Sequence, residues 1–189
     1  MRAIYSLAIF LGIPIILLHL ALRGLRNPAY LRRWPERFAR FHAPRPHGIV
    51  VHAVSVGEVN AASPLVRALA LRFPEIPLTV TTFTPTGSDR ARVLFSDSVF
   101  HVYVPLDTRA AVRRFFERIR PCLLVIMETE IWPNLYQACG DREIPLVLVS
   151  ARISPKSVDS YRKLLPLFRE TLSHGIVIAA QSEADADRF

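Results

Sequence analysis

From residue 47 to the end of the chain, short runs of apolar and β-branched residues alternate with longer stretches of helical character. Such an alternation is typical of a parallel sheet, because each helix returns the chain to the start of the next strand. The pattern therefore predicts a mainly parallel, doubly wound α/β fold. The predicted strands are 48–54, 78–82, 100–104, 122–127, 145–149 and 176–180, and the predicted helices are 61–73, 87–95, 108–120, 132–139 and 157–173.

Local signals refine two of the predicted helices. Asp107 stands just before the third helix, where a short polar side chain accepts a hydrogen bond from the first turn, so it is the predicted N-cap. Pro166 lies inside the last predicted helix. We expect it to break or kink that helix, because proline has no amide hydrogen to donate.

An apolar stretch from Ile4 to Leu22 precedes the α/β pattern. As a helix it would be about 28 Å long, close to the roughly 30 Å hydrocarbon core of a bilayer. The alternative is a cleaved signal peptide, which would have a shorter apolar region and small residues at its exit, whereas Arg23 follows here. The stretch is therefore predicted to anchor the chain in a membrane. More arginines follow it than precede it, so the rest of the chain is expected to face the cytoplasm.

The net charge of +8 is concentrated in one segment, because residues 23–45 hold seven arginines and one acid. The chain from residue 46 onward is nearly neutral, which argues against a nucleic-acid-binding face. Aromatic residues recur between the arginines at helical spacing. From Pro35 this predicts a short amphipathic helix, either lying on anionic lipid or packing its aromatic stripe on the globular domain; the sequence favours neither.

Three regions follow from these patterns. Residues 1–22 form the predicted anchor, 23–46 a basic amphipathic juxtamembrane segment and hinge, and 47–189 a Rossmann-like domain. A new helix signal opens at Ser182, so we expect this domain to be truncated at its C-terminal end. Cys122 and Cys139 show no disulfide or metal-ligand spacing, which suits a reducing compartment.

In an open α/β sheet, ligands bind beyond the carboxyl ends of the strands, where the strand order reverses. With the order 3-2-1-4-5-6, the loops after the first and fourth strands flank that point. Glu58 follows the first strand, and Glu128 and Glu130 follow the fourth. Glu58 is the sharper candidate for a general base, and Gly57 before it would allow a tight turn. The alternatives are a helix cap for Glu58 and an ion pair with an arginine for the other two.

Other polar groups give weaker signals. The turn 84–88 could bind a phosphate on its backbone amides, although an ordinary helix N-cap is favoured there. Arg152, after the fifth strand, could meet an anionic substrate or could be solvated. Asp185 and Asp187 have the DxD spacing of some metal-binding sites, but a chance occurrence is favoured over a metal site. His52 is predicted to be a core histidine.

Two acidic motifs stand out: His52-Ala53-Val54-Ser55-Val56-Gly57-Glu58 and Glu128-Thr129-Glu130-Ile131-Trp132-Pro133-Asn134-Leu135. In these motifs, and at 81–87, 149–154, Tyr161 and 181–183, the sequence resembles the 3-deoxy-D-manno-octulosonic acid (Kdo) transferases. The likeness covers nearly the whole chain.

The resemblance implies the N-terminal domain of a GT-B glycosyltransferase, which contacts mainly the acceptor. It implies transfer of Kdo from CMP-Kdo to a lipid A precursor in lipopolysaccharide synthesis at the bacterial inner membrane, with inversion and with no metal or other cofactor. Glu58 matches the family's proposed general base. The expected substrate-binding residues are Ser55, Gly57, Thr84, Thr86, Gly87, Glu128, Glu130 and Arg152.

The family's second, nucleotide-binding domain has no counterpart in the 189 residues. We therefore expect this chain to fold, and to be inactive by itself. Two other functions stay open: a GT-B transferase that uses a different nucleotide sugar, and a membrane-anchored, non-catalytic module that binds anionic lipid.

Overall fold

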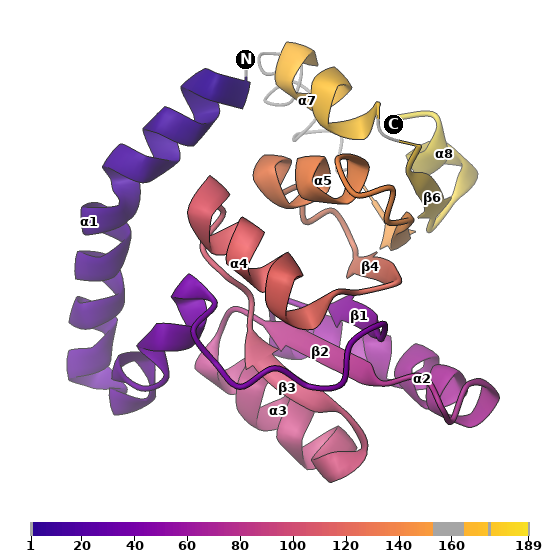
Figure 1. Cartoon of the computed structure of the whole chain (residues 1–189), viewed down its shortest axis with the longest axis horizontal. Coiled ribbons are helices and arrows are strands. Elements are labelled where there is room, and N and C mark those ends of the chain that lie inside the picture. The colour runs from indigo at the N-terminus through magenta and orange to yellow at the C-terminus, as the bar shows by residue number, and fades with distance from the viewer. Residues whose placement is uncertain (1, 153–164, 174, 189) are drawn as a thin grey trace.

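The computed structural model describes residues 2–152, 165–173 and 175–188 (Figure 1). Six strands form one parallel sheet in the order β3-β2-β1-β4-β5-β6. This is the predicted doubly wound order, with the reversal between β1 and β4. The strands are β1 Ile49–His52, β2 Leu78–Thr82, β3 Phe100–Tyr103, β4 Leu123–Met127, β5 Leu146–Ala151 and β6 Val177–Ala180.

The central strands are buried on both sides because helices cover both faces of the sheet. Every residue of β1 and β2 is buried. Alternate strand residues point to opposite faces, so Val50 and Val51 belong to different apolar clusters. One cluster packs under α4 (Arg109–Ile119) and α5 (Pro133–Gly140), and the other under α2 (Val56–Arg72) and α3 (Pro85–Phe95).

Two predicted helix starts need correction, and a third can be compared only in part. Helix α2 begins at Val56, five residues before the predicted start, because the Ser55 side chain caps it. Helix α4 is capped by Thr108, whose side chain accepts from the amide of Ala111, so the prediction of Asp107 as the cap is wrong. Helix α7 (Leu165–Leu172) has Pro166 in its first turn, and the predicted helical residues 157–164 lie outside the described part of the chain. Helix α8 is short and spans Glu183–Ala186.

Asp107 instead joins two segments. Its buried carboxylate accepts hydrogen bonds from the backbone amides of Asn134 and Leu135, at 3.0 and 2.9 Å, and so satisfies donors in the first turn of α5. The hydroxyl of Tyr5 also donates to it, at 2.9 Å. Burial raises the pKa of Asp107 from 3.8 to about 6, against the lowering effect of these hydrogen bonds.

The raised pKa of Asp107 predicts a pH-dependent stability. The folded protein holds this proton more tightly than the unfolded chain does, so the free energy of unfolding falls as the pH rises from 3.8 to 6. Two pKa units correspond to about 3 kcal/mol. Denaturant unfolding in detergent between pH 4 and 7 measures this fall, and the Asp107→Asn variant, which cannot ionise at this position, is expected to show a fall that is smaller by about that amount. An equal pH dependence in the two proteins would contradict the assignment.

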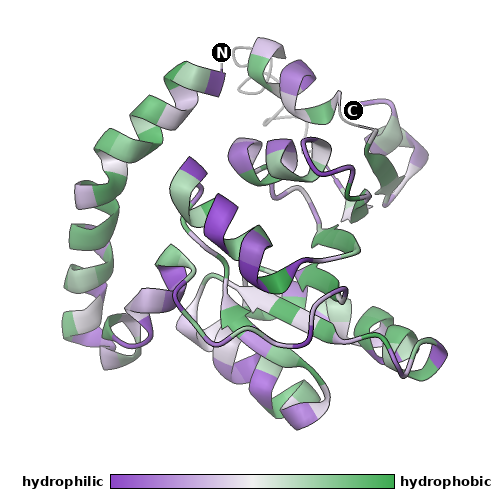
Figure 2. Ribbon diagram, viewed as in Figure 1, coloured by the Kyte–Doolittle hydropathy of each residue, from purple (hydrophilic) through white to green (hydrophobic). Residues whose placement is uncertain are grey.

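Helix α1 (Arg2–Arg26) is longer than the predicted anchor and has the length and composition to cross a membrane. Figure 2 shows it as the most continuously apolar helix of the molecule. Near its start, the hydroxyl of Ser6 donates to the side-chain oxygen of Asn134 at 2.8 Å. The large apolar side chains that it leaves exposed are Ile4, Leu7, Phe10, Leu11, Ile15, Leu18, Leu22 and Leu25.

The juxtamembrane segment forms two 3-10 helices, η1 (Pro28–Leu31) and η2 (Trp34–Phe38), in place of the predicted amphipathic helix. Arg33 and Ala39, with φ of 59° and 55°, flank η2 in the left-handed region and prevent a longer helix. Phe41 packs against Phe115 in the core. The segment therefore packs on the globular domain, which was one of the two alternatives; contact with lipid stays a prediction. A third 3-10 helix, η3 (Ser96–Ser98), precedes β3.

Candidate active site at the strand-order reversal

The three candidate glutamates lie in the loops and first turns beyond the carboxyl ends of β1 and β4, on the two sides of the strand-order reversal. Glu58 is in the first turn of α2, and Glu128 and Glu130 follow β4. Glu58 is only 7% exposed. The rings of His52 and Trp132, one from each predicted acidic motif, lie 5.6 Å apart, so the fold brings the two motifs together.

Glu58 is held by a reciprocal cap at the start of α2. Its amide donates to the Ser55 hydroxyl at 3.4 Å, and that hydroxyl donates to the Glu58 carboxylate at 3.0 Å. The other carboxylate oxygen accepts from the amide of Val54 at 2.7 Å. The capping role considered for Glu58 is therefore present, and its carboxylate is fixed in direction.

Burial raises the pKa of Glu58, and the charges of the two glutamates after β4 raise it further. The hydrogen bonds from Val54 and Ser55 act in the opposite direction. A carboxylate with a raised pKa is a stronger base than an exposed one. The same environment that makes Glu58 a cap thus also suits proton abstraction.

Gly57 does not make the tight turn that was expected of it. It is exposed within α2, and a Cβ atom added there would meet only the Ser55 hydroxyl, at 3.8 Å. The local fold would accept a side chain at this position. The space beside Gly57 is open and lies next to the residue that carries the candidate base.

The Thr84–Gly87 turn is a helix cap. The Thr84 hydroxyl accepts from the Gly87 amide at 3.1 Å and donates to the Val54 carbonyl at 3.3 Å. A Cβ atom on Gly87 would lie 3.0 Å from the Thr84 hydroxyl, so glycine is needed for the close approach of α3 to the loop after β1. Thr86 is exposed. The favoured capping role is confirmed, and phosphate binding at Thr84, Thr86 and Gly87 stays a prediction.

The two glutamates after β4 differ in their partners. Glu128 has a left-handed backbone, with φ of 56°, and its carboxylate forms an ion pair with Arg152 at 3.3 Å, which is the alternative considered for it. Glu130 accepts a hydrogen bond from the Trp132 indole at 3.0 Å. Burial and the charge of Glu128 raise the pKa of Glu130.

Trp132 links the two sides of the reversal through aromatic contacts. Its ring lies edge-on to His52, with centroids 5.6 Å apart, and 6.0 Å from the ring of Phe83. His52 is fully buried, and burial lowers its pKa to about 4. Its Nδ1 contacts the Thr81 hydroxyl at 2.8 Å, while its Nε2 has no partner among the described residues, so this core histidine is only half satisfied.

No group of three or more His, Cys, Asp or Glu side chains within the described ranges is arranged to hold a metal ion. Asp185, in the DxD-like pair, hydrogen bonds with Ser182 and forms an ion pair with Arg188 at 2.9 Å. These contacts give it a local structural role at α8.

A family model described as 3-deoxy-D-manno-octulosonic-acid transferase (kdotransferase) matches residues 32–189. The chain belongs to the Kdo transferase family. It is 41% identical to the 3-deoxy-D-manno-octulosonic acid transferase of Haemophilus influenzae and 36% identical to that of Bordetella pertussis, with all of this chain covered in each comparison. It is 38% identical to a probable mitochondrial Kdo transferase of Arabidopsis thaliana over 93% of this chain.

The chain spans about half the length of these Kdo transferases, covering 45%, 46% and 40% of them, respectively. Among solved structures, a UDP-N-acetylglucosamine 2-epimerase is similar in fold, with a TM-score of 0.54 and 15% identity over 76% of this chain and 44% of the epimerase. That likeness concerns the fold alone. It agrees with the Rossmann-like sheet expected for half of a GT-B glycosyltransferase.

Sequence reasoning missed two residues that shape this region. Asp107 was assigned to the wrong helix, and Arg37 was read only as part of a basic stripe. Both are buried charged side chains whose partners come from distant segments. The sequence signal for Arg37 was its position one turn after Arg33 in an aromatic-rich segment, which does not distinguish a buried from a solvated arginine.

Proposed function

We propose that this chain is the acceptor-side half of an enzyme that transfers Kdo from CMP-Kdo to a lipid A precursor. Its membership of the Kdo transferase family supports the Kdo chemistry. The observation that carries the proposal is the position of Glu58: a buried carboxylate of raised pKa at the strand-order reversal, held by Val54 and Ser55 beside open space at Gly57.

In the proposed reaction, Glu58 accepts the proton of the acceptor hydroxyl. The hydroxyl oxygen forms a bond to the anomeric carbon of Kdo, while the bond from that carbon to the phosphate oxygen breaks and CMP leaves with the electron pair. Attack opposite the leaving group inverts the anomeric centre. Each Glu58 oxygen already accepts one hydrogen bond and keeps a second lone pair for the proton.

The raised pKa of Glu58 serves this step. A base is most effective when its pKa approaches the working pH, because it is then ionised and still binds a proton well. Glu130 and Glu128 assist by raising that pKa. The resemblance to the family supports a reaction without a catalytic metal.

We place this chemistry at the cytoplasmic face of a bacterial inner membrane. Helix α1 is apolar enough to anchor the chain, and arginines follow it more densely than they precede it. The acceptor is an anionic lipid, which arginines near the membrane surface would attract. The donor is expected to bind mainly to a second domain, so the 189 residues alone are proposed to be inactive.

The test is Kdo transfer from CMP-Kdo to a lipid A precursor in detergent, with a chelator present. The 189-residue chain is compared with a version extended through its natural downstream sequence. Activity of the extended protein alone supports the proposal. Efficient turnover by the short chain would refute the half-enzyme assignment. Inactivity of both, or preference for a competing nucleotide sugar, would refute the Kdo assignment.

The reciprocal cap at Ser55 and Glu58 favours a second candidate, a non-catalytic membrane-anchored module that binds anionic lipid. In that function Glu58 would only stabilise the start of α2. Replacing Glu58 separates the two functions, because a cap affects stability and a base affects rate.

A further inference from the structure

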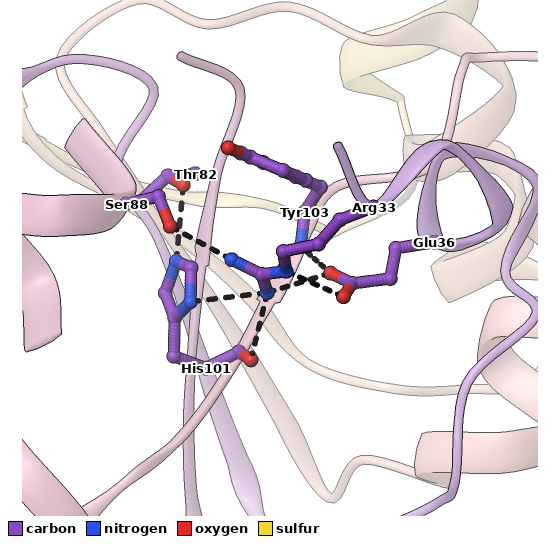
Figure 3. A network of polar contacts seen from close by, with 6 residues as sticks. All are labelled: Arg33, Glu36, Thr82, Ser88, His101 and Tyr103. Atoms are coloured by element: carbon purple, nitrogen blue, oxygen red, sulfur yellow. Dashed lines mark hydrogen bonds and ion pairs between the residues drawn. The ribbon is translucent and has the colours of Figure 1, made fainter. Parts of the chain in front are cut away.

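Residues 33–41, which we name the strap, run along the outer edge of the sheet. Figure 3 shows its first contacts, which surround Arg33 and Glu36. The two side chains form a two-pronged ion pair, with N–O distances of 2.6 and 2.7 Å. Arg33 also donates to the His101 carbonyl at 3.3 Å, and Glu36 accepts from the Tyr103 amide at 2.9 Å.

These contacts satisfy backbone groups at the exposed edge of β3. β3 is the edge of the sheet, so the outward carbonyl of His101 and the outward amide of Tyr103 have no neighbouring strand among the described residues. The ion pair supplies one donor and one acceptor at the same spacing, as a neighbouring strand would. The strap is therefore fixed in register on the sheet edge.

The next arginine of the strap, Arg37, is completely buried. Its guanidinium lies 4.8 Å from the ring centroid of Phe83 and 4.5 Å from that of Tyr103. Its Nη2 donates to the Phe83 carbonyl at 3.0 Å, whereas Nε and Nη1 have no partner in the described part of the chain. Burial lowers the pKa of Arg37.

A cation buried with one hydrogen bond is costly, because its desolvation is only partly offset by the two rings. An apolar side chain of similar volume would fill the same space at lower cost. A packing role alone therefore does not account for Arg37. The bond that distinguishes it from an apolar residue is the one to the Phe83 carbonyl.

That bond leads to the candidate base in two steps. The Phe83 amide donates to the Val54 carbonyl at 3.1 Å, and the Thr84 amide does so at 3.3 Å. The amide of Val54 donates to the Glu58 carboxylate at 2.7 Å. The loop after β2 thus holds the carbonyl group of Val54, and the amide group of the same residue holds the Glu58 carboxylate.

We propose that Arg37 is a positioning residue for Glu58, acting through the Phe83 carbonyl and the backbone of Val54. It holds the loop after β2 against the loop after β1, and so keeps the Val54 amide aimed at the carboxylate. Its catalytic consequence rests on the proposed role of Glu58 as the base. The structural link from Arg37 to Val54 does not depend on that role, and it can be measured in the 189-residue chain itself.

The experiment is amide hydrogen exchange by NMR on the labelled chain in detergent micelles, comparing Arg37→Met, Arg37→Lys and the parent. In Arg37→Met we expect exchange at Val54 and Phe83 to be at least about 10-fold faster, with the amides of Ile126 and Leu148 changed less than about 2-fold. The lysine ammonium can still donate a hydrogen bond to the Phe83 carbonyl, so Arg37→Lys is expected to restore most of the protection. The matched control is Arg40→Met, which changes an exposed arginine of the same strap.

Unchanged protection of Val54 and Phe83 in Arg37→Met would overturn the proposal. So would an equal acceleration across the sheet, which marks general destabilisation. If Arg37→Met does not fold, Arg37→Lys decides: a smaller acceleration confined to the same two amides supports the link, and an even one across the sheet refutes it.

A second readout uses the extended, transfer-competent protein. There Arg37→Met is expected to lower kcat about 10-fold or more, with the KM for the lipid acceptor within about 2-fold. A change confined to KM would overturn the positioning role. If Kdo transfer proves to be the wrong reaction, the hydrogen-exchange result still tests the link between Arg37 and Val54 independently.

Discussion

Replacing Glu58 by Gln in the extended protein is expected to lower kcat about 10²- to 10⁴-fold, the range that a positioned general base contributes. Glutamine keeps the shape of the side chain and can still accept from the Val54 amide and donate to the Ser55 hydroxyl, so the cap at the start of α2 is largely retained. It cannot take a proton from the acceptor. Initial rates of Kdo transfer, together with the binding of acceptor lipid, measure the effect.

The pH dependence of kcat provides an independent test of the base. Glu58 must be ionised to act as the base, and its pKa is raised, so the acidic limb of the kcat profile is expected above the range of an exposed glutamate. This limb should be absent from the residual activity of Glu58→Gln. The control is Glu75→Gln, the same change at an exposed glutamate after α2. Full activity in Glu58→Gln would remove Glu58 from the mechanism and leave it with the capping role alone.

Replacing Gly57 by Ala is expected to separate stability from activity. The new methyl group has room, and alanine is favoured over glycine in a helix by up to about 1 kcal/mol, so the free energy of unfolding should stay the same or rise. The methyl group would, however, lie 3.8 Å from the Ser55 hydroxyl that donates to Glu58, in space that we propose the acceptor uses. Displacing the acceptor hydroxyl by about 1 Å can lower kcat/KM by about 10- to 100-fold. Denaturant unfolding and transfer rates test the two effects in parallel.

The matched variant is Gly87→Ala, which lies in the first turn of α3, three residues after the N-cap Thr84, whereas Gly57 lies two residues after Ser55. There a Cβ atom would lie 3.0 Å from the Thr84 hydroxyl and 3.2 Å from the Val54 carbonyl. We expect it to destabilise the fold by about 1–3 kcal/mol, since backbone or cap must move. If Gly57→Ala lost as much stability as Gly87→Ala, the space beside Gly57 would be needed by the fold and not by a substrate.

Sequence patterns predicted the sheet well because they report local burial. Every predicted strand overlaps an observed one, and the strand order is the predicted one. The glutamates were placed correctly at the strand-order reversal for the same reason: topology brings the loops after β1 and β4 together, whatever the side chains between them. The capping of α2 by Ser55 was readable from the Ser55–Glu58 spacing, yet the predicted helix began too late.

The juxtamembrane segment shows where such reasoning ends. Arginines between aromatic residues indicated an amphipathic helix, but left-handed residues at Arg33 and Ala39 limit the helix to η2. The reason is tertiary: Glu36 and Arg33 bind the edge of β3, which the local sequence does not reveal. The backbone follows these contacts in preference to helical hydrogen bonding.

The sequence by itself determined the alternation of strands and helices, the apolar first helix, the family, and the acidic motifs at one end of the sheet. These depend on periodicity and on residues close together in the chain. Only the tertiary structure decided which charged groups are buried and what they hold. Asp107 accepts a hydrogen bond from the amide of Asn134 in α5, 27 positions away along the chain. Arg37 donates to the carbonyl of Phe83, 46 positions away. Burial of a charge depends on which distant donors and acceptors the packed elements leave unsatisfied, and that is settled only when the elements meet.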